Sequence, residues 1–358
     1  MVPRLPDTAA LVPYLKEIDA NRWYSNFGPL QRRFEARLAG HFHLSPDDVL
    51  CVGNCTAGLM LALLAAARRR GGYCIMPSFS FAASAHAVLA AGLTPYFIDV
   101  DPGSWAITPA AVAEAARSAG GPVSAALVVS PFGAPVDVAT WDDFAEASGI
   151  PAVVDAAAGF DGAATGKSAV AVSLHATKAL AAGEGGIVVS RDKALIGAVA
   201  ARSNFGFRGD RRASAPGFNG KMSEYNAAVG LASLDAWPEK RTALLRLTRL
   251  YCAALADIGN VGLSPGFGDG WVSSTCNVAF DRPVADAAMR ALADAGIDSR
   301  QWWSKGCHRE PAFSECPHGD LSVTEDLGRR VLGLPFHEAL GEDDIGRIAG
   351  VVASAAQR

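Results

Sequence analysis

VVDAAAGFDGAATGKSAVAVSLHATKALAAGEGGIVVS, residues 153–190, contains an acid and a lysine that each follow a short apolar run. Asp155 comes directly after the run Pro151–Val154, and Lys178 comes four residues after the run Ala169–Leu174. A third run, Ile187–Val189, closes the stretch. Short apolar runs rich in β-branched residues predict buried strands, so Asp155 and Lys178 are expected just beyond the ends of two strands.

Such a pair has a specific chemical use. A lysine held among small residues past a buried strand loses solvent, so its pKa falls and its amine can act as a nucleophile. A carboxylate at the end of a neighbouring strand keeps a pyridine nitrogen protonated, as the cofactor pyridoxal 5′-phosphate (PLP) requires. The pair Lys178 and Asp155 therefore suggests a PLP site. The plainer alternative is that Asp155 caps a helix and Lys178 is a surface lysine.

The composition is that of a globular protein. With 358 residues, half of them apolar, the chain can form one large α/β domain and a smaller companion. The net charge of -4 gives no reason to expect a nucleic acid or a membrane as a partner. The N-terminus MVPRLPDTAA has no signal-peptide pattern, and no apolar run is long enough to span a membrane. We therefore expect a soluble, cytoplasmic protein.

The seven cysteines are scattered and odd in number, which favours reduced thiols over a disulfide framework. Only the segment with Cys307, His308, Cys316 and His318 invites a metal site. Its spacing matches no standard zinc pattern, and it is rich in Pro, Gly and charge, so we expect an ordinary loop.

Apolar runs alternate with helical segments along residues 49–202, which predicts a mainly parallel sheet with helices on both faces. The expected strands are 49–52, 73–76, 94–100, 123–129, 151–154, 169–174 and 187–189. The expected helices in this part and before it are 8–19, 30–38, 59–69, 82–91, 109–119, 141–148 and 192–202.

Ligands of such sheets bind beyond the carboxyl ends of the strands. Four features fall there: the small-residue turn Gly53–Gly58, the turn with Phe79 and Phe81, Asp155, and Lys178. Small residues between a strand and a helix leave backbone N–H groups free at the helix start, where an anion can bind. The four features together predict a ligand site at one edge of the sheet.

The later part of the chain changes character. A long Gly- and Arg-rich loop, 203–220, suggests a functional or mobile segment, and helices are expected at 223–237 and 239–258. We place a domain boundary near Pro238, so that 1–238 form an N-terminal segment with the large domain and 239–358 a small α+β domain. Strand-like residues 273–280 and helices 285–295 and 342–355 are expected in the small domain.

Several motifs together resemble the DegT/DnrJ/StrS family of sugar aminotransferases, which are fold-type I PLP-dependent enzymes. The resemblance extends along nearly the whole chain, and no single motif carries it alone. Its segments are Tyr24–Pro29, Pro77–Ala85, Ile98–Asp101, Ser173–Lys178 with Gly183–Gly186, Gly217–Glu224, and Leu334–His337.

The resemblance implies a role for each matching residue. Lys178 would hold PLP as a Schiff base, and Asp155 would pair with the ring nitrogen. Phe81 would stack on the ring, and Asn219 would reach the phosphate of the neighbouring subunit in a homodimer with shared active sites. The residues expected at the cofactor are Asn54, Cys55, Thr56, Phe81, Asp155, Ser173, Lys178 and Asn219. Alternatively, Phe81 is a core aromatic, Ser173 a strand hydroxyl and Asn219 a turn residue.

Three positions depart from the family pattern. Cys55 stands where glycine usually precedes the phosphate-loop threonine, which keeps the N–H but restricts the backbone. Ala158 replaces a polar residue near the ring hydroxyl, and Lys221 stands where arginine is common and loses its bidentate fork. The essential pair Lys178 and Asp155 is intact.

The expected activity is transfer of an amino group from L-glutamate to a keto group of a nucleotide-linked (dTDP) 3-keto- or 4-keto-6-deoxysugar, with the cofactor alternating between PLP and its aminated form PMP. A keto-cyclitol acceptor, a PLP-dependent dehydratase and a non-catalytic PLP-binding sensor remain alternatives. Candidate partners of the diphosphate are Arg22, Arg202, Arg208, Arg211, Arg212, Lys221 and Lys305, or these form a solvated surface. Trp302 and Trp303 are expected in the small-domain core rather than in a sugar pocket.

Overall fold

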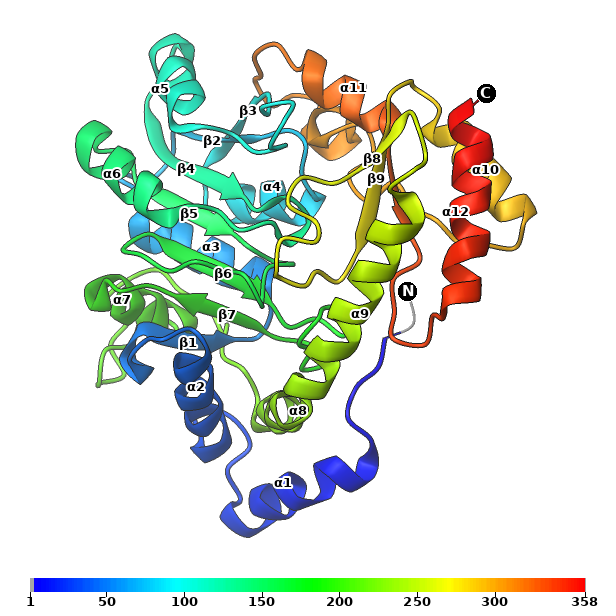
Figure 1. The fold of residues 1–358 in the computed structure, drawn as a ribbon. Helices are drawn as coiled ribbons and strands as arrows, with labels where there is room; N and C mark the ends of the chain where they lie inside the picture. Colours follow the sequence, from blue (N-terminus) through cyan, green and yellow to red (C-terminus); the bar gives the residue numbers. More distant parts are fainter. Residues whose placement is uncertain (1–2, 358) are drawn as a thin grey trace.

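The computed structural model describes residues 3–357 and has an α/β architecture built on a seven-stranded sheet (Figure 1). The strands lie in the order β1-β7-β6-β5-β4-β2-β3. β7 is antiparallel to both of its neighbours, and the other neighbouring pairs are parallel. The strands of this sheet are β1 Val49–Val52, β2 Tyr73–Pro77, β3 Thr94–Ile98, β4 Val123–Val129, β5 Ala152–Asp155, β6 Ala169–Ser173 and β7 Gly186–Val189.

Side chains of the central strands are buried on both faces because helices cover both. Along β4, Ala126 and Val128 join one hydrophobic core, whereas Ala125 and Leu127 join the other. Successive side chains of a strand point to opposite faces, so continuous apolar runs are needed in such strands. This explains why the strands were readable from the sequence as unbroken apolar runs.

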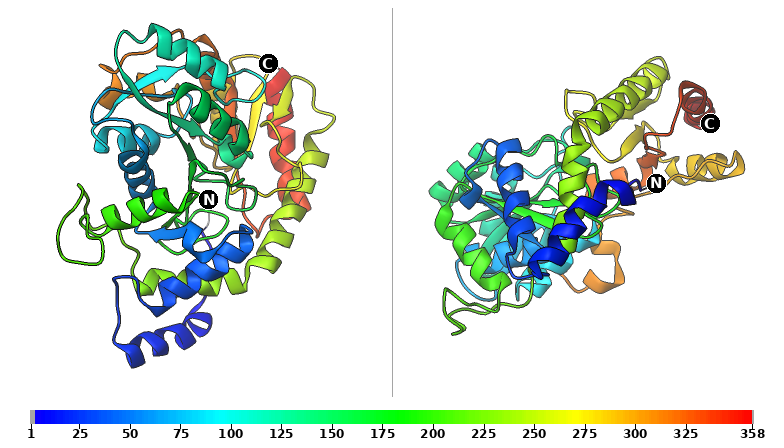
Figure 2. Two further views of the ribbon diagram at one scale, coloured as in Figure 1. Left: turned by 90° about the vertical axis from the view of Figure 1, so that its left-hand side faces the viewer. Right: turned by 90° about the horizontal axis from the view of Figure 1, so that it is seen from below.

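The helices form a layer on each side of the sheet (Figures 1 and 2). α3, α4 and α7 contribute to one core, and α2, α5, α6 and α8 contribute to the other. The helices are α1 Thr8–Asn21, α2 Pro29–His41, α3 Cys55–Ala66, α4 Ala82–Ala90, α5 Pro109–Ser118, α6 Val138–Ser148, α7 Lys193–Ser203, α8 Glu224–Asp235, α9 Trp237–Leu255, α10 Ala285–Asp294, α11 Ser322–Arg330 and α12 Glu342–Gln357. Short 3-10 turns lie at Pro46–Asp48, Pro131–Gly133, Cys307–Arg309 and Pro311–Phe313.

The C-terminal part has its own antiparallel sheet in the order β10-β9-β8, from strands Val331–Leu334, Cys276–Phe280 and Val261–Leu263. Helices α9, α10 and α12 accompany this sheet in Figure 1. The proposed boundary between residues 238 and 239 falls in the first turn of α9. The division of the chain into two domains at that point stays a prediction.

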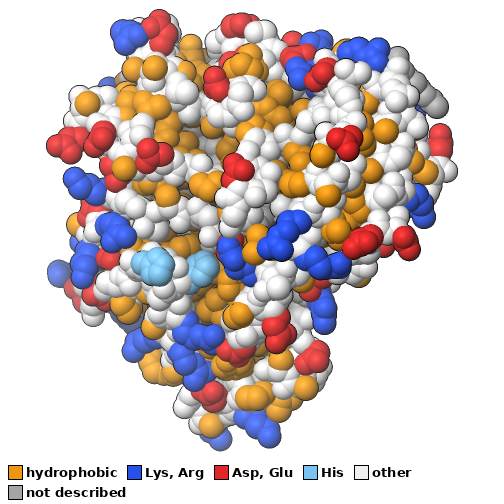
Figure 3. Space-filling view, in the orientation of Figure 1, with side chains coloured by type: hydrophobic (Ala, Val, Ile, Leu, Met, Phe, Trp, Pro, Cys, Tyr) orange, Lys and Arg blue, Asp and Glu red, His pale blue; other side chains and the backbone are white. Residues whose placement is uncertain are grey.

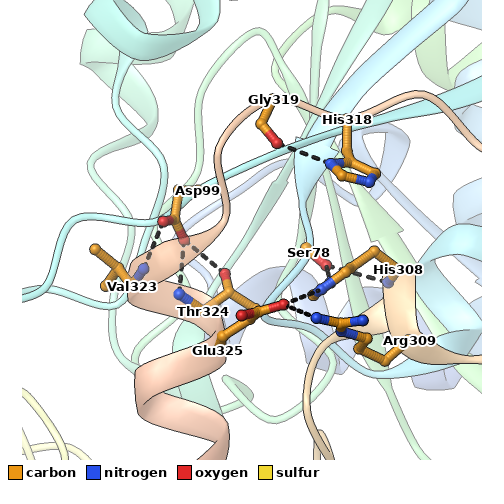
Figure 4. A network of polar contacts seen from close by, with 9 residues as sticks. All are labelled: Ser78, Asp99, His308, Arg309, His318, Gly319, Val323, Thr324 and Glu325. Carbon is orange, nitrogen blue, oxygen red and sulfur yellow. Dashed lines mark hydrogen bonds and ion pairs between the residues drawn. The ribbon is translucent and has the colours of Figure 1, made fainter.

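Polar contacts fasten the C-terminal part to the large sheet (Figure 4). Asp99, just past β3, accepts hydrogen bonds from the backbone N–H groups of Val323 and Thr324 at 2.7 and 2.8 Å and so caps α11. The Ser78 hydroxyl, just past β2, lies 2.7 Å from His308 Nδ1. Both contacts start at carboxyl ends of strands, so they brace the edge where the ligand site is expected.

Most predicted elements are confirmed, and the ends of some differ. The helix expected at 59–69 begins at Cys55, because the Asn54 side chain accepts a hydrogen bond from the N–H of Ala57 and caps it. Its end at Ala66 leaves Arg69 outside the helix. The expected turn Gly53–Gly58 is thus partly the first helical turn. Strands β8 and β10 and helix α11 were not predicted.

Other expectations concern single features. The seven cysteines are all free thiols. Within residues 3–357, no group of three or more His, Cys, Asp and Glu side chains is arranged to hold a metal ion. None of the helices that the structure describes is long and apolar enough to cross a membrane.

Candidate active site

A cavity of about 880 Å³ opens at the carboxyl edge of the large sheet. Its walls come from the start of α3, the Ser80–Ser84 segment, the ends of β5 and β6, and residues of the C-terminal part. Seven of the eight predicted cofactor residues line it: Asn54, Cys55, Thr56, Phe81, Asp155, Ser173 and Lys178. The convergence predicted from strand ends is therefore confirmed as geometry.

The start of α3 offers a site for a phosphate group. Asn54 is the N-cap, and its side-chain oxygen accepts from Ala57 N–H at 2.8 Å. The N–H groups of Cys55 and Thr56, in the first turn, have no helical acceptor and are free to bind an anion. Burial raises the pKa of the Cys55 thiol well above its usual value, so this side chain stays neutral beside an anion. The replacement of glycine by cysteine is thus compatible with phosphate binding.

Asp155 ends β5 and is only 5% exposed. Its Oδ2 accepts from the Ser84 hydroxyl at 2.6 Å, and its Oδ1 accepts from the N–H of Ala157 at 3.0 Å. Burial raises the pKa of this carboxyl, while the two hydrogen bonds and the charge of Lys178 oppose the rise. Such a carboxylate gains from a cationic partner in the cavity, and a protonated pyridine ring is one.

Lys178 lies in the loop between β6 and β7, where its N–H donates to the carbonyl of His175 at 2.9 Å. Burial lowers the pKa of the Lys178 ammonium, and the nearby Cys55 and Asp155 work against this shift. A lysine with a lowered pKa has a larger fraction of free amine near neutral pH. The surface-lysine alternative is wrong, since Lys178 is partly buried on the cavity wall.

Phe81 and Ser173 also lie on the cavity wall in positions that suit cofactor binding. Phe81 precedes α4 and is 57% exposed on the cavity wall, so it is not a core aromatic residue. An exposed aromatic ring beside an acid and a lysine is suited to cover the face of a flat cofactor. Ser173, buried at the end of β6, accepts from the N–H of His175 at 3.2 Å and keeps its hydroxyl proton for a ligand.

The tryptophan pair lies differently from the expectation. Both Trp302 and Trp303 line the cavity, and both are only partly buried. Trp303 stacks on Phe132, with ring centroids 3.9 Å apart and planes at 15°. The two indoles therefore form part of the pocket wall as well as packing against the hydrophobic core, so the expectation of a core position alone is corrected.

Arg300 is a cavity residue that the sequence reasoning missed. Its backbone exchanges two hydrogen bonds with Gly333, at 3.0 and 2.8 Å, and its guanidinium lies 5.3 Å from the centroid of a Trp302 ring. A Cβ on Gly333 would lie 2.3 Å from Trp302 Nε1, so glycine allows this packing. Arg300 takes part in none of the salt bridges found among residues 3–357.

The other cationic candidates lie outside this cavity. Besides Lys178 and Arg300, no lysine or arginine of the described part of the chain lines it. Arg212 pairs with Asp210 in the exposed loop, and Lys221 donates to Asn204 at 2.9 Å. Basic and acidic side chains are interspersed over the face in Figure 3. The cations named from the sequence are Arg22, Arg202, Arg208, Arg211, Arg212, Lys221 and Lys305.

Asn219 is the one predicted cofactor residue that does not line the cavity of its own chain. It is exposed, and a single β-bridge pairs it with Asn204 across the loop. This placement is compatible with a turn residue and also with a residue offered to a second copy of the chain. Ala158 lines the cavity, as expected from its position three residues after Asp155.

The chain is similar to known proteins along nearly its whole length. A model of the DegT/DnrJ/EryC1/StrS aminotransferase family matches residues 7–353. Protein Rv3402c of Mycobacterium tuberculosis is 32% identical, with 99% of this chain and 89% of the relative covered. The dTDP-4-amino-4,6-dideoxy-D-glucose transaminase of Shigella dysenteriae is 28% identical, with 98% and 96% covered. DesI, whose crystal structure was determined in the presence of its TDP-sugar product, is 36% identical in sequence, and the two structures match with a TM-score of 0.88. The match covers 99% of this chain and 92% of DesI.

Proposed function

Because the chain belongs to the DegT/DnrJ/EryC1/StrS aminotransferase family, we propose that it moves the amino group of L-glutamate to a keto group of a nucleotide-linked deoxysugar. It is a PLP-dependent aminotransferase, and its relatives include an enzyme named for a dTDP-linked amino sugar and a structure with a TDP-sugar product. These names support a dTDP-linked 3-keto- or 4-keto-6-deoxysugar as the acceptor.

The observation that carries the proposal is the placement of Lys178, Asp155 and the start of α3 around one cavity. These residues fit PLP: a helix N-terminus for the phosphate, a buried carboxylate for the ring nitrogen, an amine for the aldehyde, and Phe81 for the ring face. When bound, PLP supplies an electron sink that stabilises negative charge at the carbon bearing the amino group.

Lys178 has two tasks in this proposal. It holds the cofactor at rest, and its amine, freed when the donor binds, takes the proton from Cα of L-glutamate. The pKa of Lys178 is lowered by its burial, which suits a base that must work near neutral pH. In the second half of the reaction the same amine gives and takes protons at the sugar carbon that receives nitrogen.

Asp155 keeps a proton on the ring nitrogen throughout, and the N–H groups of Cys55 and Thr56 with the Ser173 hydroxyl hold the phosphate. Arg300, on the part of the cavity wall that comes from the C-terminal residues, is the cation that we assign to an anionic group of the substrates. Trp302 and Trp303 narrow the space in which the sugar binds and exclude water from part of it.

We also propose that the active unit is a homodimer in which Asn219 reaches the phosphate bound by the partner. Large apolar side chains exposed on the single chain support this proposal, since they include Tyr24, Phe205 and Tyr225. The ring centroids of Tyr24 and Tyr225 are 6.3 Å apart and their rings stack, and Phe205 lies in the same loop as Asn219. Exposed aromatic residues of this kind are typical of subunit interfaces.

The test is a turnover assay with L-glutamate and a dTDP-linked keto-deoxysugar, in which 2-oxoglutarate and the amino sugar are both measured. The proposal predicts equal amounts of the two products. A free keto-cyclitol serves as the competing acceptor. Turnover of the cyclitol alone would contradict the nucleotide-sugar proposal, and dehydration of the sugar without release of 2-oxoglutarate would contradict transamination.

A further inference from the structure

Ser84 makes the shortest side-chain contact to Asp155. It is the third residue of α4 and is 1% exposed, and its hydroxyl lies 2.6 Å from Asp155 Oδ2. Neither the sequence motifs nor the comparisons assign this residue a role. Its partner, Asp155, is the carboxylate that faces the cofactor's ring nitrogen in the proposed function.

The charge of Asp155 decides which way the hydrogen bonds around Ser84 point. An ionised carboxylate can only accept, so Ser84 must donate its single hydroxyl proton to Asp155. The Ser84 oxygen can then accept from the Ser80 hydroxyl, 3.0 Å away. The carbonyl of Ser80 in turn accepts from the Cys307 thiol at 3.3 Å. Asp155 is thus held by a chain of hydrogen bonds in which the Ser80 hydroxyl donates to Ser84 and the Ser84 hydroxyl donates to Asp155.

The segment that carries Ser80 is itself fixed. Cys307 N–H donates to the carbonyl of Ser78 at 2.7 Å, and the Ser78 hydroxyl lies 2.7 Å from His308 Nδ1. The C-terminal part of the protein therefore fixes the turn that supplies one hydroxyl of this chain of hydrogen bonds. Pre-organised contacts of this kind orient a catalytic group without spending binding energy during the reaction.

The charge state of Asp155 depends on opposing influences. Burial raises the pKa of the Asp155 carboxyl, and the Ser84 hydroxyl, the Ala157 N–H and the Lys178 charge lower it. Other titratable or charged groups on the cavity wall are Cys55, His175, Glu184 and Arg300. Among the contacts that stabilise the ionised form of Asp155, the hydrogen bond from the Ser84 hydroxyl has the largest effect. A substitution that deletes one oxygen atom removes it.

We propose that Ser84 is a positioning residue for transamination, whose hydroxyl aims the Asp155 carboxylate at the ring nitrogen and stabilises its ionised form. The inference rests on the role proposed for Asp155, and it adds a residue on which that role depends. A neutral Asp155 accepts the ring proton less well, so loss of the Ser84 hydroxyl weakens the ion pair between Asp155 and the cofactor ring.

The test compares Ser84→Ala and Ser84→Thr with Ser124→Ala in the PLP-bound protein. Ser124 is also a fully buried serine, and its hydroxyl bonds to the carbonyl of Gly71, outside the cavity. The readouts are the PLP dissociation constant and the pH titration of the cofactor's absorption band. Neither readout needs L-glutamate or a sugar, so failure of the proposed substrates would not affect them.

Ser84→Ala removes an influence that lowers the pKa of Asp155, so the carboxyl becomes neutral at higher pH. The acid limb of the spectral titration should therefore move to higher pH, and PLP should bind about tenfold more weakly, the scale of one charged hydrogen bond. Ser84→Thr keeps a hydroxyl, so its PLP affinity and its spectral titration should both be close to those of wild type. If the alanine variant does not fold, Ser84→Cys, which is similar in size and a weaker donor, replaces it. It should shift the PLP affinity and the titration in the same direction as predicted for Ser84→Ala, by a smaller amount.

Two results would overturn the inference. One is a folded Ser84→Ala protein with wild-type PLP affinity and an unshifted titration. The other is an equal shift in Ser124→Ala, which would show that any buried serine has this effect. Circular dichroism melting of all variants establishes that they are folded.

Discussion

The Ser78 hydroxyl lies 2.7 Å from His308 Nδ1 and joins two parts of the chain that are 230 residues apart (Figure 4). On its other side, His308 Nε2 lies 3.4 Å from Glu325 Oε1, and Arg309 also pairs with Glu325. The Ser–His–Glu order resembles a hydrolytic triad, but Ser78 is fully buried and does not line the cavity. The contact is therefore structural: it fixes the turn before Phe81 to the C-terminal part.

This contact predicts a pH dependence of stability. Burial lowers the pKa of His308 below that of an exposed histidine, against the raising influence of Glu325; Arg309 and His318 add to the lowering. The unfolded state thus binds a proton at higher pH than the folded state does. The stability contributed by neutral His308 is present above the unfolded pKa of about 6.5 and is lost as pH falls through the folded pKa.

The prediction is measured by urea unfolding of wild type and His308→Gln between pH 8 and 5. The variant should lose about 1–3 kcal/mol at pH 8, because buried hydrogen bonds are broken. It should also show a smaller loss of stability on acidification than wild type. His43→Asn, at an exposed histidine, is the control. An unchanged slope in His308→Gln would show that His308 does not titrate as described.

Asp155→Asn tests the acid itself. Asparagine keeps the size of the side chain but cannot hold a positive ring nitrogen, so turnover should fall on the order of 100-fold or more. The cofactor should still attach to Lys178, because that bond does not need Asp155. Asp48→Asn, at another buried acid outside the cavity, should keep near-wild-type turnover. Near-wild-type turnover in Asp155→Asn would refute the role of this carboxylate.

Arg300→Gln tests the unpaired cation on the cavity wall. If Arg300 binds an anionic group of a substrate, the KM for that substrate should rise about 10- to 100-fold, as expected for loss of a charge-assisted hydrogen bond. Separate measurement of the reaction with L-glutamate and of that with the sugar shows which substrate it binds. Arg290→Gln, at an exposed arginine of α10, should leave both KM values unchanged. Unchanged KM values in Arg300→Gln would leave the residue without a substrate role.

Hybrid dimers test whether active sites are shared. Lys178→Ala lacks the catalytic amine, and Asn219→Asp places a negative charge against the partner's phosphate. In a mixed dimer, the one wild-type Lys178 faces the wild-type Asn219 of the other chain, so a single intact site forms. Statistical mixing should restore about a quarter of wild-type activity from two nearly inactive variants. Activity no higher than the sum of the separate variants would mean that Asn219 does not act across the interface.

The sequence predicted the cofactor site better than the substrate site, for a physical reason. Asp155 and Lys178 follow apolar strands, and Thr56 lies in the first turn of the helix after β1. Parallel strands bring their carboxyl ends to one edge of the sheet. The local sequence pattern and the strand topology are therefore enough to predict that these residues lie close together. Arg300 and Trp302 come instead from the C-terminal part, where an unpredicted strand, β10, pairs with Arg300 through Gly333 and sets its position.

Ser84 shows a second limit of pattern reading. It lies inside the segment Pro77–Ala85 that resembled the family, yet nothing local distinguishes it from Ser80 or Ser78. Its role depends on a hydrogen bond to a residue 71 positions later in the chain. The start of α3 was placed too late for a related reason, because the capping side chain of Asn54 fixes it rather than the apolar pattern.

The most direct measurement is the visible absorption spectrum of the purified protein with PLP, before and after addition of L-glutamate, in wild type and Lys178→Ala. We predict that wild type shows the visible band of lysine-bound PLP and that L-glutamate replaces it with the near-ultraviolet band of the aminated cofactor. Lys178→Ala should bind PLP without forming that band and should not turn over, whereas Lys167→Ala, at an exposed lysine, should behave as wild type. A wild-type band and response in Lys178→Ala would contradict the central claim that Lys178 carries the chemistry.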